Sequence, residues 1–176
     1  MGEIEHDIDV HRDVAIETGR AEGARLFAKT PEIEERLGID AINATVRSAS
    51  ALTFGASTLA GQLVAHVERG DVTQVGPIVV AGTTDLIALA GDVTLKNAGN
   101  TFANTVSVKT SGALGLTSAG ALTLGEVTTV GDTELKSTGK LNLGTSTFAG
   151  KFKANSGGFD IVQTGPIKIG GNSDFD

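Results

Sequence analysis

The sequence contains no cysteine, tryptophan or tyrosine, and it has only one methionine, three prolines and seven phenylalanines in 176 residues. The lack of cysteine excludes disulfide bonds, thiolate metal sites and cysteine nucleophiles. The scarcity of large aromatic residues argues against a broad globular core, which normally uses them to fill volume. The hydrophobic 40% of the chain is mostly Ala, Val, Leu and Ile. We therefore expect one domain with a thin core of small and branched side chains.

Basic residues are also in deficit, with 14 Lys and Arg against 21 Asp and Glu and a net charge of -7. Because nucleic-acid binding needs a basic face, we expect no nucleic-acid partner. The longest uncharged apolar stretch, 48–67, is interrupted by Ser, Thr, Gly, Gln and His, so we expect no membrane insertion. The acidic start of the chain lacks the pattern of a secretory signal, which leaves a cytoplasmic location open.

The N-terminal part differs from the rest in composition. Residues 1–50 hold 11 of the 21 acidic residues but only four of the 24 glycines. We therefore divide the chain into an acidic segment, 1–38, which is a candidate cap, and a repeat region, 39–176. Alternating apolar residues predict strands in 8–16 and in 42–46.

Helix signals occur late in the acidic segment, over residues 20–29 and 30–37. Thr30 is placed as an N-cap, Pro31 occupies the first helical position and Gly38 follows as a stop. These signals predict a short helix before the repeat region begins.

A long internal repeat dominates the remainder. When the chain is shifted by 89 residues, 51–87 lies on 140–176 without a gap. The two segments share 14 of 37 positions, and most of the others exchange one apolar residue for another. Such self-similarity is the signature of a repeat architecture.

A shorter period lies inside the long one. Residues 120–125 match 139–144 at a shift of 19, and Gly-Asp-Val-Thr at 70–73 recurs at 91–94, at a shift of 21. Each unit of about 20 residues contains short apolar alternations separated by Gly, Asn, Ser or Thr. This pattern predicts strands of three to five residues with frequent turns.

Short strands with so narrow an apolar face cannot bury it alone, but stacked coils can. With parallel pairing at ~4.8 Å, residues 51–176 make roughly six coils and a rod about 30 Å long. Glycine then falls at the corners, where the chain turns sharply. The sequence therefore predicts an all-β fold, a right-handed parallel β-helix, preceded by the helix-containing segment.

Three phrases of the repeat region carry a family resemblance, namely GDVTLKNAGNTFANTVSV (91–108), GALTLGEVTTVGDTEL (120–135) and SGGFDIVQTGPIKIGG (156–171). They resemble the repeats of filamentous-haemagglutinin-type adhesins, the large exoproteins exported by two-partner secretion. The resemblance implies a β-helix on, or released from, a Gram-negative surface. It also implies a stalk or binding segment that is not an enzyme, with a host-cell or glycan receptor as partner.

Two alternatives remain open at this point. The sequence stops at residue 176 inside a repeat, and an exposed terminal coil is an edge that pairs readily, so a self-assembling intracellular scaffold with end-to-end association is the second interpretation. The third is a glycan-active enzyme, because such enzymes use parallel β-helices with clustered carboxylates. We expect no catalytic residues, cofactor or metal.

Arg69-Gly70-Asp71 forms an Arg-Gly-Asp triplet at an expected corner. Some members of the resembled family carry this triplet for recognition by host integrins, so these three residues are the candidate receptor-binding site. The triplet also has a plain explanation, because Gly70 and Asp71 belong to the repeat and only Arg69 is additional.

Other polar residues have both structural and functional interpretations. Asp71, Asp92 and Asp160 recur at similar points of their units, as do Asp85 and Asp174, so they either stack to gather calcium or cap turns. We expect His66 at a solvated position. The last third of the chain is mildly basic. Its lysines either contact sulfated glycans or keep the outer strand faces solvated. They are Lys136, Lys140, Lys151, Lys153 and Lys168.

Overall fold

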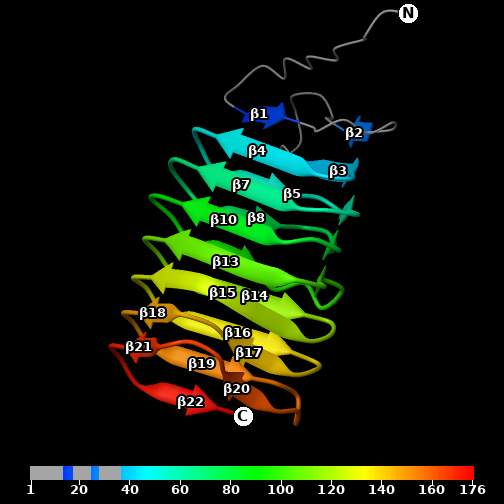
Figure 1. Cartoon of the computed structure of the whole chain (residues 1–176). Helices are drawn as coiled ribbons and strands as arrows, with labels where there is room; N and C mark the ends of the chain where they lie inside the picture. Colours follow the sequence, from blue (N-terminus) through cyan, green and yellow to red (C-terminus); the bar gives the residue numbers. More distant parts are fainter. Residues whose placement is uncertain (1–13, 18–24, 28–36) are drawn as a thin grey trace, which may run out of the picture.

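The structure is a computed structural model that describes residues 14–17, 25–27 and 37–176. In this part of the chain it contains strands and turns but no helix, and hence no helix able to cross a membrane. The strands stack in flat coils along one axis, with the chain passing from one end of the stack to the other (Figure 1). The parallel β-solenoid predicted from the repeat is confirmed.

About seven coils form the stack, and most coils contribute one strand to each of three sheets. The five-stranded sheet contains β2 (Arg25–Phe27), β3 (Gly38–Ala41), β6 (Ser57–Leu59), β9 (Ile78–Val80) and β12 (Thr101–Phe102). The seven-stranded sheet contains β5 (Leu52–Phe54), β8 (Val72–Gln74), β11 (Val93–Leu95), β14 (Leu114–Ser118), β16 (Thr133–Ser137), β19 (Phe152–Asn155) and β22 (Ser173–Phe175). The ten-stranded sheet contains β1 (Val14–Glu17), β4 (Ala44–Ser48), β7 (Leu63–Val67), β10 (Thr84–Ala88), β13 (Thr105–Thr110), β15 (Leu122–Thr129), β17 (Leu141–Leu143), β18 (Ser146–Phe148), β20 (Ile161–Gln163) and β21 (Ile167–Ile169).

Alternation along each strand builds the core. In β7 the pattern of burial is strictly alternate, with Leu63, Ala65 and Val67 fully buried between half-buried residues. Because the strands pair in parallel, each inward residue lies on an inward residue of the next coil, as Leu63 does on Thr84. The interior is one continuous column of Ala, Val, Leu, Ile and Phe, with buried Ser and Thr residues at the ends of several strands. Residues 57–175 form six of the coils, in agreement with the number predicted, and residues 37–54 form another.

The 89-residue repeat does not return to the same face of the solenoid. β6 of the five-stranded sheet corresponds to β18 of the ten-stranded sheet, and β7 of the ten-stranded sheet corresponds to β19 of the seven-stranded sheet. Paired residues in neighbouring coils lie 18 to 22 positions apart, so 89 residues wind about four and one-third coils. Equivalent residues of the two repeat copies therefore lie on neighbouring faces of the solenoid. The same repeat sequence can form a strand in any of the three sheets.

β15 lets the repeat change face without interrupting the stack. It pairs with β13 through a register irregularity between Val106 and Val108, and on its other side its two halves pair separately with β17 and β18. β15 is thus a single bent strand that takes the positions held by two separate strands, β17 and β18, in the following coil. A β-bulge re-aims a strand in this way without loss of the flanking pairs.

The N-terminal segment departs from one expectation. Arg25–Phe27, inside the segment with helix signals at 20–29, form strand β2, which pairs antiparallel with β3. The free edge of β3 offers hydrogen bonds that override local helix propensity. Of the strand expected over 8–16, residues 14–16 lie in β1, which pairs antiparallel with β4, and residues 8–13 lie outside the described residues. The helix expected over 30–37 lies outside the described residues apart from Leu37, which forms a bridge with Phe54.

Corner glycines permit the close approach of successive coils, and replacing one tests this. A Cβ on Gly91 would lie 2.1 Å from the carbonyl oxygen of Gly70, whereas a Cβ on Gly120 would have nothing within 4 Å. We expect Gly91→Ala to lower the free energy of unfolding by about 1–3 kcal/mol, because backbone must shift to relieve the contact. Gly120→Ala is the matched control and should change it by less than about 0.5 kcal/mol. Urea unfolding followed by circular dichroism measures both, and equal losses in the two variants would contradict the argument.

Candidate functional site

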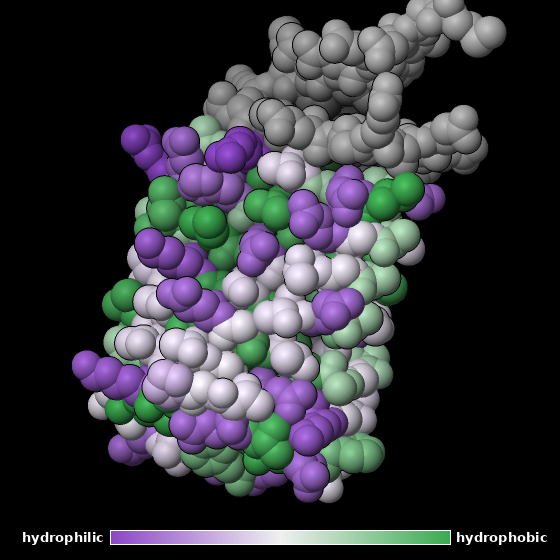
Figure 2. All heavy atoms as spheres, viewed as in Figure 1, coloured by the Kyte–Doolittle hydropathy of each residue, from purple (hydrophilic) through white to green (hydrophobic). Residues whose placement is uncertain are grey.

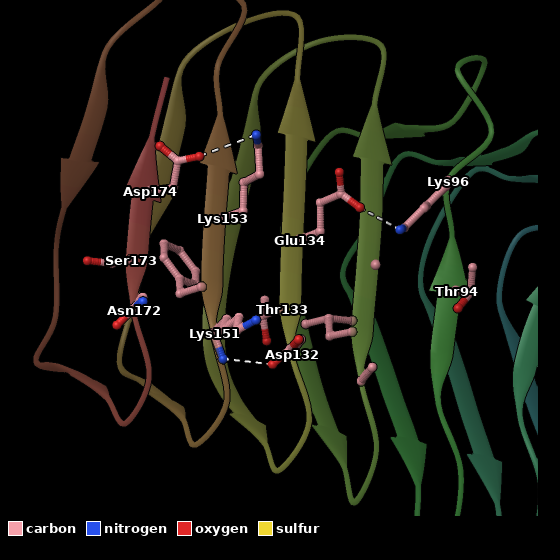
Figure 3. A pocket seen from close by; sticks show the side chains of 14 residues that line it. Thr94, Lys96, Asp132, Thr133, Glu134, Lys151, Lys153, Asn172, Ser173 and Asp174 are labelled. Atoms are coloured by element: carbon pink, nitrogen blue, oxygen red, sulfur yellow. Dashed lines mark hydrogen bonds and ion pairs between the residues drawn. The ribbon is translucent and has the colours of Figure 1, made fainter.

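A shallow groove runs along the outer face of the seven-stranded sheet, over β11, β14, β16, β19 and β22 (Figure 3). Its floor dips at Gly115, which has no side chain in a column of outward residues that includes Thr94, Glu134 and Lys153. On the face of the solenoid that Figure 2 shows, hydrophilic and hydrophobic residues are interspersed. The groove is therefore a candidate ligand-binding surface on the seven-stranded sheet.

One ion pair crosses the floor of this groove. Lys96 extends over Gly115, so that a Cβ on Gly115 would lie 2.2 Å from its Cε, and the Lys96 Nζ donates to Glu134 Oε2 at 2.6 Å. Figure 3 shows the two side chains pointing toward one another across the intervening strand. The hydrogen bond and the charge of Lys96 lower the pKa of Glu134. Lys96 thereby links coils that are not adjacent.

A second set of charges lies at the C-terminal end of the groove. Lys153 Nζ is 3.3 Å from Asp174 Oδ2 and 3.7 Å from Asp176 Oδ2. Bonding to Asp174, and its charge together with that of Asp176, raises the pKa of Lys153. All these side chains are about half exposed, and exposed pairs contribute little to stability. The charges alternate in sign, so the groove has no strong bias for a ligand of one charge.

Aspartates form a row at the corner before the seven-stranded sheet. Asp71 Oδ1 accepts a hydrogen bond from the Asp92 N–H at 2.8 Å, and Asp92 Oδ1 accepts one from the Ala113 N–H at 2.7 Å. Asp132 makes the same bond to the Lys151 N–H at 2.8 Å. Each carboxylate caps the backbone of the next coil. Asp71 and Asp92 thus bond to backbone, as the turn-capping interpretation required, but the bond goes to a following coil and not to their own turn.

Three other aspartates are not in that row. Asp160 precedes β20, which pairs with β17 in the ten-stranded sheet, so it lies at a different corner from Asp71 and Asp92. Asp85 and Asp174 lie on β10 and β22, which belong to different sheets. Asp160 therefore does not stack with Asp71 and Asp92, nor Asp174 with Asp85, because the 89-residue shift advances the chain by one face. No group of three or more His, Asp or Glu close enough to hold a metal ion occurs among the described residues.

The Arg-Gly-Asp triplet lies at the corner between β7 and β8. Arg69 and Asp71 are exposed, and Gly70 has a φ of +86°, a conformation that favours glycine. The Asp71 carboxylate is partly engaged by its bond to the Asp92 N–H. The triplet is therefore exposed to solvent at this corner. Gly70 and Asp71 also have structural roles, in the turn and in the bond to the next coil.

His66 and the lysines are dispersed. His66 is half-buried on β7, with Nδ1 3.2 Å from an Arg47 guanidinium nitrogen, so it is less solvated than expected. Lys151 and Lys153 line the groove, whereas Lys168 lies on β21 in another sheet. Lys136, on β16, also belongs to the seven-stranded sheet, whereas Lys140 precedes β17 of the ten-stranded sheet, so the five lysines do not all share one face.

A buried amide pair is the main polar feature that sequence reasoning missed. Asn100 is fully buried, and its Nδ2 donates to Gln74 Oε1 at 2.8 Å while its Oδ1 accepts from Gln74 Nε2 at 2.8 Å. Asn100 Oδ1 also accepts from the Ile78 N–H, and Nδ2 also donates to the Leu95 carbonyl. The pair closes the corner where coils three and four meet. The sequence held one indication of this pair, namely the additional turn residues 97–100. They make the spacing between Val79 and its partner Thr101 22 residues, longer than in most coils.

The ion pair in the groove gives a pH prediction. Because the pKa of Glu134 is lower in the folded chain than its usual 4.5, its contribution is present above that value and is lost as the pH falls through the folded pKa. We expect Glu134→Gln to cost at most about 1 kcal/mol at pH 7, and nothing under more acidic conditions. Thermal unfolding between pH 7 and pH 3 measures this difference. Glu126→Gln, at an exposed position on β15, is the control, and a pH-independent loss in Glu134→Gln would contradict the assignment.

Comparison with known proteins agrees with the repeat found in the sequence. A sequence model for a family described as repeats of unknown function (DUF5649) matches residues 41–109 and 130–176, which is about two thirds of the chain. The two matched segments begin 89 residues apart, the same separation as the long repeat. No curated protein and no solved structure matches the chain.

Proposed function

Because this chain belongs to the DUF5649 family of repeats, we propose that its solenoid is a non-enzymatic rod within an adhesin-like exoprotein. One observation carries the proposal, namely the unbroken column of apolar residues that joins about seven coils. A stack in which every coil is held by its neighbours is stiff along its axis and adds length in proportion to the number of coils. Its role is to hold a binding part of the exoprotein away from the cell surface.

The displacement of the repeat between faces supports a rod over a dedicated binding surface. Equivalent outward residues such as Asp85 and Asp174 lie on different sheets. A binding surface spread over successive repeats needs its residues on one face, as in other repeat proteins. A rod requires only that the inward residues keep alternating, and both copies of the repeat meet that requirement.

The cell-surface or secreted location is part of the same proposal. It rests on the resemblance of 91–108, 120–135 and 156–171 to filamentous-haemagglutinin-type repeats. A host-cell or glycan receptor is the partner proposed for the exoprotein as a whole.

Receptor binding by the rod itself is the second candidate function. The observation that favours it is the exposed corner at 69–71, where Arg69 and Asp71 flank a glycine in a left-handed conformation. Such a corner offers a carboxylate to a metal-bearing receptor site. Asp71→Glu preserves charge and Arg69→Lys preserves the cation, so adhesion that is lost in both variants would assign the function to this corner.

A replacement experiment in the native gene separates the two functions. Residues 39–176 are exchanged for an unrelated β-solenoid of the same number of coils, and adhesion is compared with that after simple deletion. A rod predicts that deletion impairs adhesion and that the unrelated solenoid restores it. If the unrelated solenoid fails to restore adhesion, the segment binds a receptor itself. Polysaccharide turnover by the purified chain that is lost on a single Asp replacement would overturn its non-enzymatic assignment.

A further inference from the structure

Four charged side chains line the groove on two adjacent coils. Asp132 and Glu134 belong to the coil of β16, and Lys151 and Lys153 belong to the coil of β19. Glu134 is the register partner of Lys153, and Asp132 accepts a hydrogen bond from the Lys151 N–H. The two acidic positions therefore lie one strand spacing, about 4.8 Å, from the two basic positions. We call these four residues the four-charge site.

The opposite charges that are neighbours in this site point away from each other. Figure 3 shows Glu134 turned toward Lys96 on one side and Lys153 turned toward Asp174 on the other. The bond from Lys96 uses Oε2 of Glu134, and no other described residue bonds its Oε1. Lys151 makes no ion pair with the other described residues. The groove between the two coils thus retains unused acceptors and donors of both signs.

The repeat itself does not require these charges, because an uncharged version of the same framework occurs earlier in the chain. A shift of 89 residues places the four-charge site on Asn43, Thr45, Gln62 and Val64. Asn43 Oδ1 accepts from the Gln62 N–H at 2.8 Å, the same bond that Asp132 makes. Thr45 pairs with Val64 as Glu134 pairs with Lys153. The four charges are therefore an addition to a framework that forms without them.

We propose that the four-charge site binds a zwitterion, namely a phosphoethanolamine group. Its ammonium would donate to the carboxylates of Asp132 and Glu134, and its phosphate oxygens would accept from Lys151 and Lys153. An O–C–C bridge separates the phosphorus from the nitrogen, which gives the two charges a separation close to one strand spacing. The hollow of about 530 Å³ has the size of a small-ligand site. β14 and β22 lie on either side of the site, so it is formed within the stack.

The residue types favour this zwitterion over other small ligands. The acidic pair repels a simple anion, and the basic pair repels a simple cation. A quaternary ammonium has no N–H to donate to the carboxylates and is usually held by aromatic rings, whereas this chain has no tryptophan or tyrosine. The ion pairs of Glu134 and Lys153 are about half exposed, so a ligand can rearrange them at little cost.

Nuclear magnetic resonance titration of the isotope-labelled full chain tests the proposal. Phosphoethanolamine should shift the amide resonances of Glu134, Lys151 and Lys153 saturably. It should bind about fivefold or more tightly than ethanolamine or inorganic phosphate alone, which is what one additional exposed ion pair contributes. Phosphocholine, which lacks N–H donors on its cation, should bind more weakly than phosphoethanolamine.

Substitutions taken from the earlier copy test the residues. Glu134→Thr and Lys153→Val introduce the residues at positions 45 and 64, which the same framework accepts. Each should weaken phosphoethanolamine binding by about fivefold. Glu134→Thr should weaken binding of ethanolamine more than that of phosphate, and Lys153→Val should do the reverse. Lys136→Gln, which removes a charge on β16 outside the groove, is the matched control and should leave all affinities unchanged.

Three results would overturn the proposal. They are the absence of saturable shifts with phosphoethanolamine, equal affinity for phosphocholine and phosphoethanolamine, and equal effects of Lys136→Gln and the two site variants. Sedimentation with vesicles of phosphatidylethanolamine and phosphatidylcholine, compared with phosphatidylcholine alone, identifies the source of the group. Selective sedimentation with the former assigns a lipid headgroup. Its absence, with the soluble group still bound, assigns a phosphoethanolamine carried by a glycan or free in solution, and both outcomes support the site.

Discussion

Asn100→Leu is expected to lower the free energy of unfolding by about 3 kcal/mol or more. The substitution leaves the Ile78 N–H and the Leu95 carbonyl without a side-chain partner at a fully buried position. It also removes both bonds between Asn100 and the Gln74 amide, which keeps its bonds to the Gly76 carbonyl and the Asn97 N–H. Each buried group left without a partner costs about 1–3 kcal/mol. Leucine has the same branching and number of side-chain heavy atoms and leaves no cavity, so the lost hydrogen bonds account for the effect.

A double-mutant cycle identifies the source of that loss. If the two amides act as a pair, Gln74→Leu added to Asn100→Leu should cost much less than the sum of the single effects. Asn104→Leu is the control, because Asn104 is exposed and makes one bond, to the Ala81 carbonyl. Urea unfolding followed by far-ultraviolet circular dichroism measures all four variants. Strictly additive losses would show that the Asn100–Gln74 pair is not the unit of stability.

Phe148→Ala is expected to cost about 3–5 kcal/mol, the usual range for removing a large buried aromatic side chain. Phe148 is fully buried, and its ring centroid lies 4.4 Å from that of Phe152. The coil is closed on both sides, because Phe148 pairs with Thr129 in one direction and with Ile169 in the other. The cavity therefore cannot collapse without movement of the backbone.

The matched control for Phe148 lies at the end of the same aromatic row. Phe175 packs on Phe152 with a centroid separation of 5.4 Å but is 51% exposed, so Phe175→Ala should cost about 1 kcal/mol or less. Repeat proteins need not unfold in one step, so hydrogen exchange of β18 and β21 should accompany the unfolding curves. A loss from Phe175→Ala as large as that from Phe148→Ala would mean that the last coil is covered in solution.

Much of the fold could be predicted because its cause is local and repeated. Alternation such as that of Leu63, Ala65 and Val67 specifies a strand with one buried face, and its recurrence about every 20 residues specifies stacking. The pairing of residues about 20 positions apart follows from those two facts alone. The helix expected near residue 25 failed because an unpaired neighbouring edge, β3, decided the conformation of Arg25–Phe27.

The candidate site was less predictable because its residues meet through the stacking of different coils. Lys96 and Glu134 are 38 positions apart and join only because Gly115 leaves the space between them empty. Asp132 shares the Gly-Asp dipeptide of Asp71 and Asp92, but its place in the row depends on coil lengths of 19 and 21 residues. Asp160 shares the repeat position and still lies elsewhere, since 89 is not a whole number of coils.

The direction of the hydrogen bonds between coils determines how this solenoid would respond to a pulling force. Bonds such as Leu63 N–H to Thr83 carbonyl run along the axis of the stack, so tension applied at its two ends would open them a few at a time instead of shearing a whole sheet at once. Each coil that peels away would release a slack of about 20 residues, or roughly 70 Å of extended chain. A molecule stretched between two surfaces would lengthen in steps and would dissipate a sudden load before any covalent attachment failed.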